Sequence, residues 1–508
     1  MEFFSQNGIT SAASDTIIVV LLALFTLASV AALIVFLCKY AEDGAEVKHR
    51  FSALAVILFV GFAVRLVFAL CITGYRSDYK LFTSMFDDLA KNGLGDYYSG
   101  DASGVLYPVV YFVYLIFGGL SNAMGINDFA LGAQFTAKLP LIIADLLSAY
   151  AVYKIAYKYF NARIALVLCS FVCVSPIFFV GSAIWTSPIV FTAMFLCFAC
   201  YFLARKKCAC TIAFATAAAF SSKEGIFAFP VLAVFCGYHF VRAIINIRRD
   251  APKGGEVLAS DYRAVISVPV GLVVSLAVAY VIGLLEIAPH YGFFSYLYEF
   301  LIRPLARMDY FTYNGLSVYA LFGNNGARPD ARFPSWLFAC LFGVILVALT
   351  CVVYFTKRNR ATVVMLVAYS MFTVQIYYPN STAIGMQSVL ILVAAAYALV
   401  RDKRLITVLA VTGIVYVINS LSVIASAGYL NNLADYRFTD ASYTGSTLLS
   451  GALQAIPIVC SAIAALAHVY FTIVAVNVGM TGQKRELLHC NSGIGACFKE
   501  FLFGRRVK

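Results

Sequence analysis

The sequence predicts an all-α polytopic membrane protein, on the basis of its composition and of its long apolar stretches. Of its 508 residues, 62% are hydrophobic and 12% are charged, and the mean hydropathy is +0.87. A soluble domain is roughly 45–50% apolar and about 25% charged. The excess apolar surface indicates that lipid is the solvent, which excludes a soluble enzyme, a disordered chain and a disulfide scaffold.

Thirteen stretches are candidates for membrane-spanning helices, which need about 20 mostly apolar residues each. They lie near residues 16–38, 52–73, 134–157, 163–181, 187–204, 209–221, 225–245, 264–287, 334–355, 361–378, 384–400, 405–427 and 447–477. The apolar segment 105–120 is not counted, because a crossing there would invert the side of every later loop. We therefore expect about 13 transmembrane helices.

With this map, most of the 37 lysines and arginines fall on one side of the membrane, together with a basic tail. Cytosolic loops carry the excess of basic residues. We therefore expect an N-terminus outside and a C-terminus in the cytosol, in the plasma membrane of a bacterium or the endoplasmic reticulum of a eukaryote. The net charge of +12 then reflects orientation, and no nucleic-acid partner is expected.

The same map divides the chain into four parts. Residues 1–51 form an extra N-terminal transmembrane helix and a cytosolic loop, and residues 479–508 form a basic cytosolic tail. Between them lie a first half, 52–262, with an outer loop at 74–132, and a second half, 263–478, with an outer loop at 288–334. Loops of this length usually carry function in a compact protein.

The first outer loop places an acidic residue, Asp78, at the outer end of a span. After it, apolar residues recur at helical spacing and face a polar side, which predicts a short helix lying in the membrane interface; they are Tyr79, Phe82, Met85, Phe86, Leu89 and Ala90. Partial desolvation there would make Asp78 a better general base. The alternative is a solvated residue, or an ion-pair partner of Arg76 or Arg65.

The second outer loop alternates aromatic residues with cations. Its candidate binding residues are His290, Arg303 and Arg307. Aromatic faces suit sugar rings, but an aromatic belt at the membrane interface explains the same pattern. A cation inside a span is costly, so we expect Arg65 to have a partner, with Asp145 and Glu286 as the candidates.

Short motifs follow one another in a particular order along these segments. They are Ser77-Asp78-Tyr79, Leu89-Ala90-Lys91-Asn92-Gly93-Leu94, Tyr97-Tyr98, Tyr107-Pro108, Lys138-Leu139-Pro140, Ser182-Ala183-Ile184-Trp185 and Asn314-Gly315-Leu316. In this order they resemble the GT-C class of integral-membrane glycosyltransferases. The resemblance is strongest to bacterial mannosyltransferase-related proteins akin to the second mannosyltransferase of GPI-anchor assembly, and it covers mainly residues 52–240.

The resemblance implies an inverting transfer of a hexose, with mannose expected, from a polyprenyl- or dolichyl-phosphate sugar to a glycan, lipid or protein acceptor outside the cytoplasm. Asp78 would be the catalytic base, and neither a metal nor a cofactor is expected. The implied donor-binding residues are Tyr107, Lys138, Lys223, Glu224, His290, Arg303 and Arg307. For each cation the alternative is an ion pair or an interfacial position among membrane lipids.

The chain also departs from the family pattern. After Trp185 it continues with Thr186 and Ser187 and lacks the family's nearby carboxylate, which Glu224 could replace. Two other functions therefore stay open at this stage. One is a catalytically inactive partner subunit, and the other is a lipid or solute transporter, which should show interrupted helices and polar residues at mid-membrane.

Overall fold

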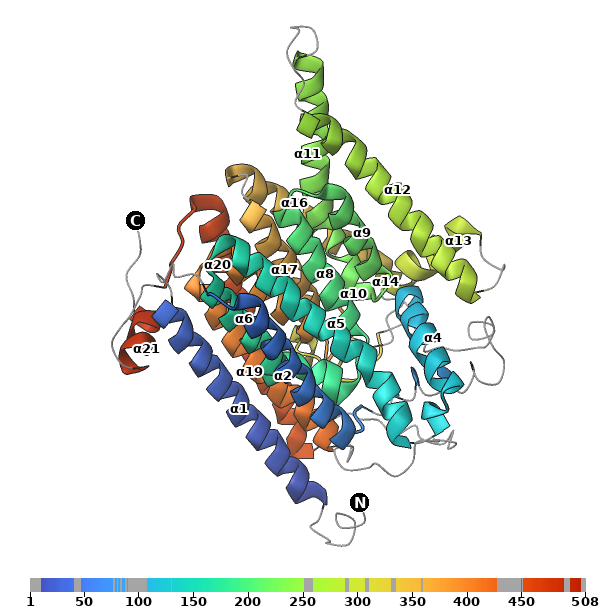
Figure 1. Ribbon diagram of the computed structural model, residues 1–508, viewed down its shortest axis with the longest axis vertical. Coiled ribbons are helices and arrows are strands. Elements are labelled where there is room, and N and C mark those ends of the chain that lie inside the picture. Colours follow the sequence, from blue (N-terminus) through green and yellow to red (C-terminus); the bar gives the residue numbers. More distant parts are fainter. Residues whose placement is uncertain are drawn as a thin grey trace.

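The computed structural model describes residues 11–40, 47–75, 78–79, 81–82, 85–86, 89, 107–128, 130–250, 259–287, 292–306, 310–329, 335–357, 360–426, 449, 451–487 and 494–503. Within these ranges the chain is almost entirely helical, and the sheet found there is one pair of two-residue strands. The helices stack side by side in an oblique bundle (Figure 1). The predicted all-helical fold is thereby confirmed.

The first half of the chain supplies long helices and several short helical segments. Their bounds are α1 Ser11–Tyr40, α2 Arg50–Cys71, α4 Pro108–Ala123, η2 Ile126–Asp128, α5 Ala130–Tyr159, α6 Ala162–Val174, α7 Pro176–Phe179, η3 Val180–Trp185, α8 Ile189–Ala204, α9 Cys208–Ala219, α10 Lys223–Ile226, α11 Phe229–Asp250 and α12 Ala259–Ile287.

The second half adds five long helices, several short ones and the two strands. Their bounds are α13 Phe293–Leu297, η6 Tyr298–Ile302, α14 Arg303–Ala306, β1 Thr312–Tyr313, α15 Val318–Leu321, α16 Ser335–Lys357, α17 Arg360–Tyr377, β2 Ser381–Thr382, α18 Met386–Val400, α19 Lys403–Ser426, η7 Gly451–Gln454, α20 Ala455–Val476, η8 Asn477–Thr481 and α21 Ile494–Phe503.

A helix lies at each of the thirteen stretches that the sequence marks as spans, but thirteen crossings are not confirmed. Among the described residues, 7 helices are long and apolar enough to cross a membrane, or 8 if the bent pair α6 and α7–η3 is one span. Several others, such as α8, α9 and α18, are apolar but shorter. The segment that the sequence leaves uncounted forms the apolar helix α4.

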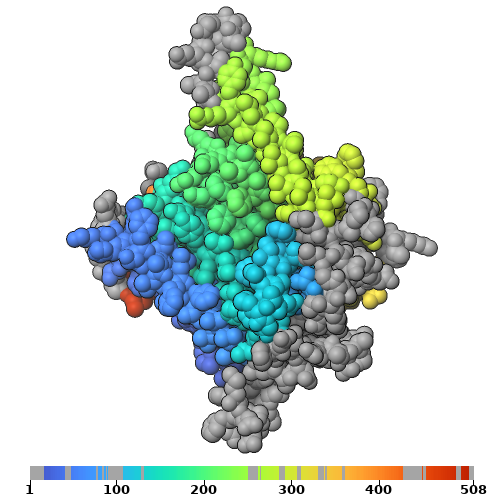
Figure 2. Space-filling view, turned by 45° about the vertical axis from the view of Figure 1, so that its right-hand side comes forward, coloured from blue at the N-terminus to red at the C-terminus, as the bar shows by residue number. Residues whose placement is uncertain are grey.

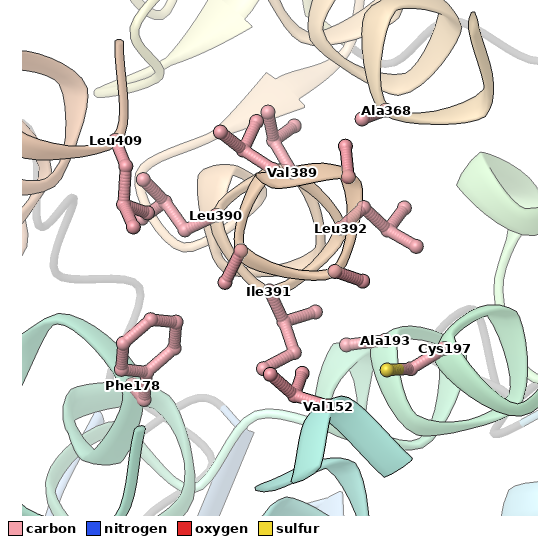
Figure 3. Close-up of a cluster of buried hydrophobic side chains, with 14 of the residues drawn as sticks. Val152, Phe178, Ala193, Cys197, Ala368, Val389, Leu390, Ile391, Leu392 and Leu409 are labelled. Atoms are coloured by element: carbon pink, nitrogen blue, oxygen red, sulfur yellow. The ribbon is translucent and has the colours of Figure 1, made fainter. Parts of the chain in front are cut away.

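Helix α18 lies at the centre of the bundle. Every one of its residues is buried. A helix that is hydrophobic on all sides is expected in such a position. Figure 3 looks along this helix, with Leu390 pointing toward Leu409 and Ile391 toward Val152. These side chains belong to one core cluster that joins both halves of the chain.

Two parts of the fold lie at its margins. Helices α11 and α12 form a hairpin that projects from one end of the bundle (Figures 1 and 2). Helix α21 packs against α1, and its Cys497 and Phe501 are buried there. The described part of the basic tail is thus partly anchored on the bundle.

The amphipathic pattern after Asp78 is helical where it is described, at 78–79, 81–82, 85–86 and 89. The predicted apolar face is buried: Tyr79, Phe82, Met85 and Phe86 belong to one cluster with residues of α4 and α8. The ring of Phe82 stacks on Tyr114 of α4, with 4.2 Å between the ring centroids. This packing holds the segment that carries Asp78 against the bundle.

Candidate active site

A cavity of about 250 Å³, here called the Asp78 cavity, opens where several parts of the chain meet. They are the segment after α2, the residue before α4, the end of η3 with the start of α8, the turn between α9 and α10, the loops around β1 and β2, and α19. The lining residues are Tyr75, Asp78, Leu81, Tyr107, Trp185, Ser187, Pro188, Ile189, Ser221, Ser222, Glu224, Tyr313, Asn314, Thr382, Ala383, Ile384 and Val423.

Asp78 is partly buried in the wall of this cavity, and its Oδ2 accepts a hydrogen bond of 2.9 Å from the indole Nε1 of Trp185. Burial raises the pKa of the Asp78 carboxyl from 3.8 to about 7, and the hydrogen bond from Trp185 opposes part of that rise. A carboxyl group with a pKa near 7 is suited to accept a proton at neutral pH.

The two cations that the sequence offers as ion-pair partners of Asp78 do not hold it in a described contact. Arg65 pairs with Asp145 instead, and Arg76 lies outside the described residues. The alternative that Asp78 forms an ion pair with Arg65 is therefore wrong. The Asp78 carboxylate lines a cavity instead.

Trp185 is held by the segment that follows α2. The amide of Tyr75 donates a 3.0 Å hydrogen bond to the carbonyl of Trp185, and the two rings stack with their centroids 4.4 Å apart. Gly74 has φ +104°, and a Cβ there would lie 2.6 Å from the carbonyl oxygen of Ile184. Only glycine fits both the backbone angle and this close approach.

The helix that ends at Trp185 is irregular, and its irregularity starts at a proline. Pro176 breaks the span, so that α6 and the segment Pro176–Trp185 meet at an angle of 54°. The last turn, η3, is a π-helix, and Thr186 follows it in the left-handed region with φ 72°. π-Helical turns are rare and are frequent at functional sites.

A buried polar network joins η3 to α2 and α5. Arg65 donates from Nε to Oδ2 of Asp145 at 2.8 Å, and Ser182 of η3 donates to the same oxygen at 2.9 Å. This confirms that Arg65 has a partner and that the partner is Asp145; the side chain of Glu286 lies outside the described residues. Because Ser182 shares the carboxylate, the ion pair also fixes one turn of η3.

The opposite wall of the cavity begins at the turn between α9 and α10. Glu224 is buried and lines the cavity, and Ser222 accepts a 2.8 Å hydrogen bond from Thr192 of α8. Lys223 donates to the carbonyl of Asn380 at 2.8 Å, which ties α10 to the loop before β2. No hydrogen bond or ion pair engages the Glu224 carboxylate within the described chain.

The remaining wall comes from the two strands and α19. β1 pairs with β2 in parallel, with Thr312 opposite Ser381. Asn314 follows β1 with φ 50°, and its carbonyl accepts a 2.8 Å hydrogen bond from Asn419 of α19. Segments more than 100 residues apart are thereby joined at the cavity.

Tyr107 lines the cavity immediately before α4. Burial raises the pKa of its phenol well above the usual value, and the nearby negative charge of Glu224 raises it further. Tyr107 therefore presents a neutral hydroxyl group, which can donate or accept a hydrogen bond.

The structure brings three of the predicted site residues together, namely Asp78, Tyr107 and Glu224. Lys223 is next to them in the chain but bonds the Asn380 carbonyl. Lys138 is fully buried outside the lining, where its ammonium group donates to the carbonyl of Ile72 and, at 2.9 Å, to that of Ala183.

The second outer loop contributes less to the cavity than the sequence predicts. Arg303 is exposed and pairs with Glu299 on its own helical segment. His290 and Arg307 lie outside the described residues. In the described ranges, no group of three or more His, Cys, Asp or Glu side chains could hold a metal ion.

Several lining residues were not predicted from the sequence as site residues. Trp185 and Asn314 occur in the quoted motifs, so a signal for them existed. Ser187 follows Trp185 in the stretch where the sequence departs from the GT-C pattern. For Ser221 and Ser222 the sequence gives no comparable signal.

Comparison with known proteins adds one finding. No curated protein sequence matches the chain. The family model of dolichyl-phosphate-mannose-protein mannosyltransferases matches residues 129–249, which is about a quarter of the chain and runs from α5 through α11. The match gives no support for a specific likeness to the GPI mannosyltransferase. Residues 129–249, which include Trp185 and Glu224 of the Asp78 cavity, are thus similar to a family of membrane mannosyltransferases.

Proposed function

We propose that the protein is an inverting glycosyltransferase that moves a hexose, expected to be mannose, from a polyprenyl- or dolichyl-phosphate sugar to an acceptor on the extracytoplasmic face of the membrane. The observation that carries the proposal is Asp78, a partly buried carboxyl group that faces a cavity and has a pKa near 7. The family match over residues 129–249 supports the sugar and the lipid carrier in general terms.

In this reaction the Asp78 carboxylate accepts the proton of an acceptor hydroxyl group while the hydroxyl oxygen attacks the anomeric carbon. The new glycosidic bond forms on the face opposite the departing phosphate oxygen, so the anomeric configuration inverts. The bond from the anomeric carbon to that oxygen breaks, and the lipid phosphate leaves as an anion. Because the leaving group is already stable, positioning and one base account for the step.

The other lining residues suit recognition of the sugar. Glu224 and Tyr107 present a carboxylate and a neutral phenol to the same cavity as Asp78. At about 250 Å³ the cavity is close to the lower end of the range of roughly 300–1,000 Å³ that ligand pockets occupy. It therefore suits one sugar ring and not the lipid chain. Lys223 is next to Glu224 in the chain, and we propose it as the cation that binds the donor phosphate.

The test is the substitution Asp78→Asn in the full chain reconstituted in liposomes. Radiolabelled polyprenyl-phosphate mannose is the donor, a membrane extract supplies acceptors, and release of the lipid phosphate is measured. Asp78→Asn keeps the size of the side chain and removes the base, so we expect transfer to fall by about 10²–10⁴-fold. Glu486→Gln, in the described part of the tail and outside the cavity lining, is the control and should keep wild-type turnover.

Wild-type turnover by the Asp78→Asn variant would show that Asp78 is not the base. If the unsubstituted protein consumes no lipid-linked sugar, while it binds a second membrane protein from the same source, the inactive partner subunit is the better interpretation.

A further inference from the structure

A second hollow region lies between α9, α11 and α12, and it shares no lining residue with the Asp78 cavity. It consists of a wide cavity of about 920 Å³ and an adjoining one of about 480 Å³. The two cavities adjoin, because Ala209, Cys210 and Val270 line both. We call the pair the α9–α12 groove.

The wide end of the groove is rich in cations. Lys206 and Lys207 precede α9, Arg242 is on α11 and Arg263 is on α12; all four line this end and are exposed. The one carboxylate there, that of Asp261, accepts a 3.4 Å hydrogen bond from Asn246. The wide end therefore carries four positive charges against one negative charge.

The narrow end is apolar and lies along two helices. Its walls are formed mainly by small residues of α9 and branched residues of α12; the lining is Val109, Phe195, Ala209, Cys210, Ala213, Thr216, Ala217, Val270, Gly271, Val274, Ser275, Val278, Ala279 and Ile282. Val274 is 53% exposed and Val278 is 52% exposed. At Gly271 the helices approach closely, since a Cβ there would lie 2.7 Å from the Cα of Ala209.

The basic end of the groove and the Asp78 cavity lie toward opposite ends of α9. The basic end adjoins Cys208, the first residue of the helix, whereas Ser221 and Ser222, just past its last residue, line the Asp78 cavity. Twelve helical residues span about 18 Å. The cations of the groove are therefore too distant to bind a donor phosphate at Asp78.

We propose that the α9–α12 groove is a binding site for an anionic membrane phospholipid. Its phosphate lies among Lys206, Lys207, Arg242 and Arg263, and an acyl chain lies along α9 and α12. A cation cluster at the end of an apolar channel matches a molecule with a negative head and a hydrocarbon tail. A soluble anion would leave the apolar walls uncovered, and a neutral lipid would leave the cations without a counter-charge. The site is independent of the proposed transferase activity.

The experiment is a lipid titration of the purified full chain, followed by native mass spectrometry. The probes are phosphatidylglycerol and phosphatidylcholine of the same acyl chains. Phosphatidylglycerol should bind tightly with one molecule per chain. In the fourfold variant Lys206→Gln, Lys207→Gln, Arg242→Gln and Arg263→Gln its affinity should fall about tenfold or more, because each cation near an anionic head adds to binding.

The matched control removes four cations that do not line the groove, in the variant Lys39→Gln, Lys48→Gln, Lys154→Gln and Lys158→Gln. Its affinity for phosphatidylglycerol should equal that of the wild type. Equal losses in both variants would mean that only the net charge matters, and no loss in the groove variant would place the lipid elsewhere; either result overturns the proposal.

A second pair of variants tests the acyl chain. Ala213→Trp puts a large ring in the apolar end and should weaken phosphatidylglycerol binding, whereas Val273→Trp, on the exposed side of α12 outside the lining, should not. Soluble glycerol phosphate is the probe for a site that binds only anions. If it displaces the lipid at equal concentration, or if Ala213→Trp binds the lipid as the wild type does, the groove does not hold an acyl chain and the proposal fails.

Discussion

The indole Nε1 of Trp185 donates a 2.9 Å hydrogen bond to Oδ2 of Asp78, and so joins the end of a π-helix to the segment that follows α2. The bond favours the ionised carboxylate, whereas burial favours the protonated form, and burial has the larger effect. The result is a carboxyl group that is about half ionised near pH 7. The pKa of the proposed base therefore depends on burial and, to a smaller extent, on this hydrogen bond.

The first prediction concerns this bond. Only the ionised carboxylate can accept a proton, so the transfer rate should rise with pH through about 7. Trp185→Phe removes the donor, and the pKa of Asp78 should rise by about 1–2 units, because a hydrogen bond to a charged group is worth about 1.5–3 kcal/mol. The pH profile of kcat/KM checks this. A profile that does not move would show that Asp78 does not set the pH dependence.

The second prediction concerns the buried ion pair of Arg65 and Asp145. Arg65→Met leaves a buried carboxylate without its counter-charge, which should destabilise the protein by about 3–5 kcal/mol. The double variant with Asp145→Leu should recover much of that loss, because it removes both charges. Thermal unfolding in detergent is the measurement, with the exposed Arg205→Met as control. Equal stability of the single and double variants would contradict the pairing.

The third prediction concerns Gly181, in the π-helix. A Cβ at this position would overlap the side-chain amide of Gln387 on α18, whose Nε2 donates to the Phe178 carbonyl at 2.7 Å. Gly181→Ala should therefore destabilise the protein by about 1–3 kcal/mol, which is the usual cost of overpacking. The pair Gly181→Ala and Gln387→Ala should regain part of the stability in the same unfolding assay. If it does not, Gln387 is not the residue that excludes the methyl group.

The fourth prediction concerns topology. Cysteines introduced at Asp101 and at Lys206 should react with a membrane-impermeant thiol reagent from opposite sides of sealed vesicles. Asp101 belongs to the predicted outer loop 74–132 and lies outside the described residues, and Lys206 belongs to a predicted cytosolic loop. The unsubstituted chain gives the background from its native cysteines. Labelling of both positions from one side would refute the predicted map.

The helices were predictable because apolar stretches of the right length determine where they form, but the number of crossings was not. Helix α18, Met386–Val400, is as apolar as a lipid-facing span, yet it is short and buried on every side. Apolarity alone does not distinguish a residue that faces lipid from one that faces another helix. Only the fold shows which side of each helix packs against other helices and which side is exposed.

Site residues could be predicted from the sequence where they flank the end of a helix, because the helix then determines their position. Asp78 lies seven residues past the end of α2 and Tyr107 immediately before α4, and both line the cavity. Lys138 is the opposite case. A buried cation needs partners, but the sequence cannot tell a ligand phosphate from the backbone carbonyls of Ile72 and Ala183.

The π-helical turn η3 makes the geometry beside Asp78 depend on the number of residues in one helical turn. Such a turn holds one more residue than an α-helical turn would, and each residue of an α-helix rotates the chain by about 100°. If the same residues formed a regular α-helix, Trp185 would lie about 100° further around the helix axis and its indole would face another direction. A change of helix type, with no loss of any polar group, would be enough to separate Trp185 from the carboxylate.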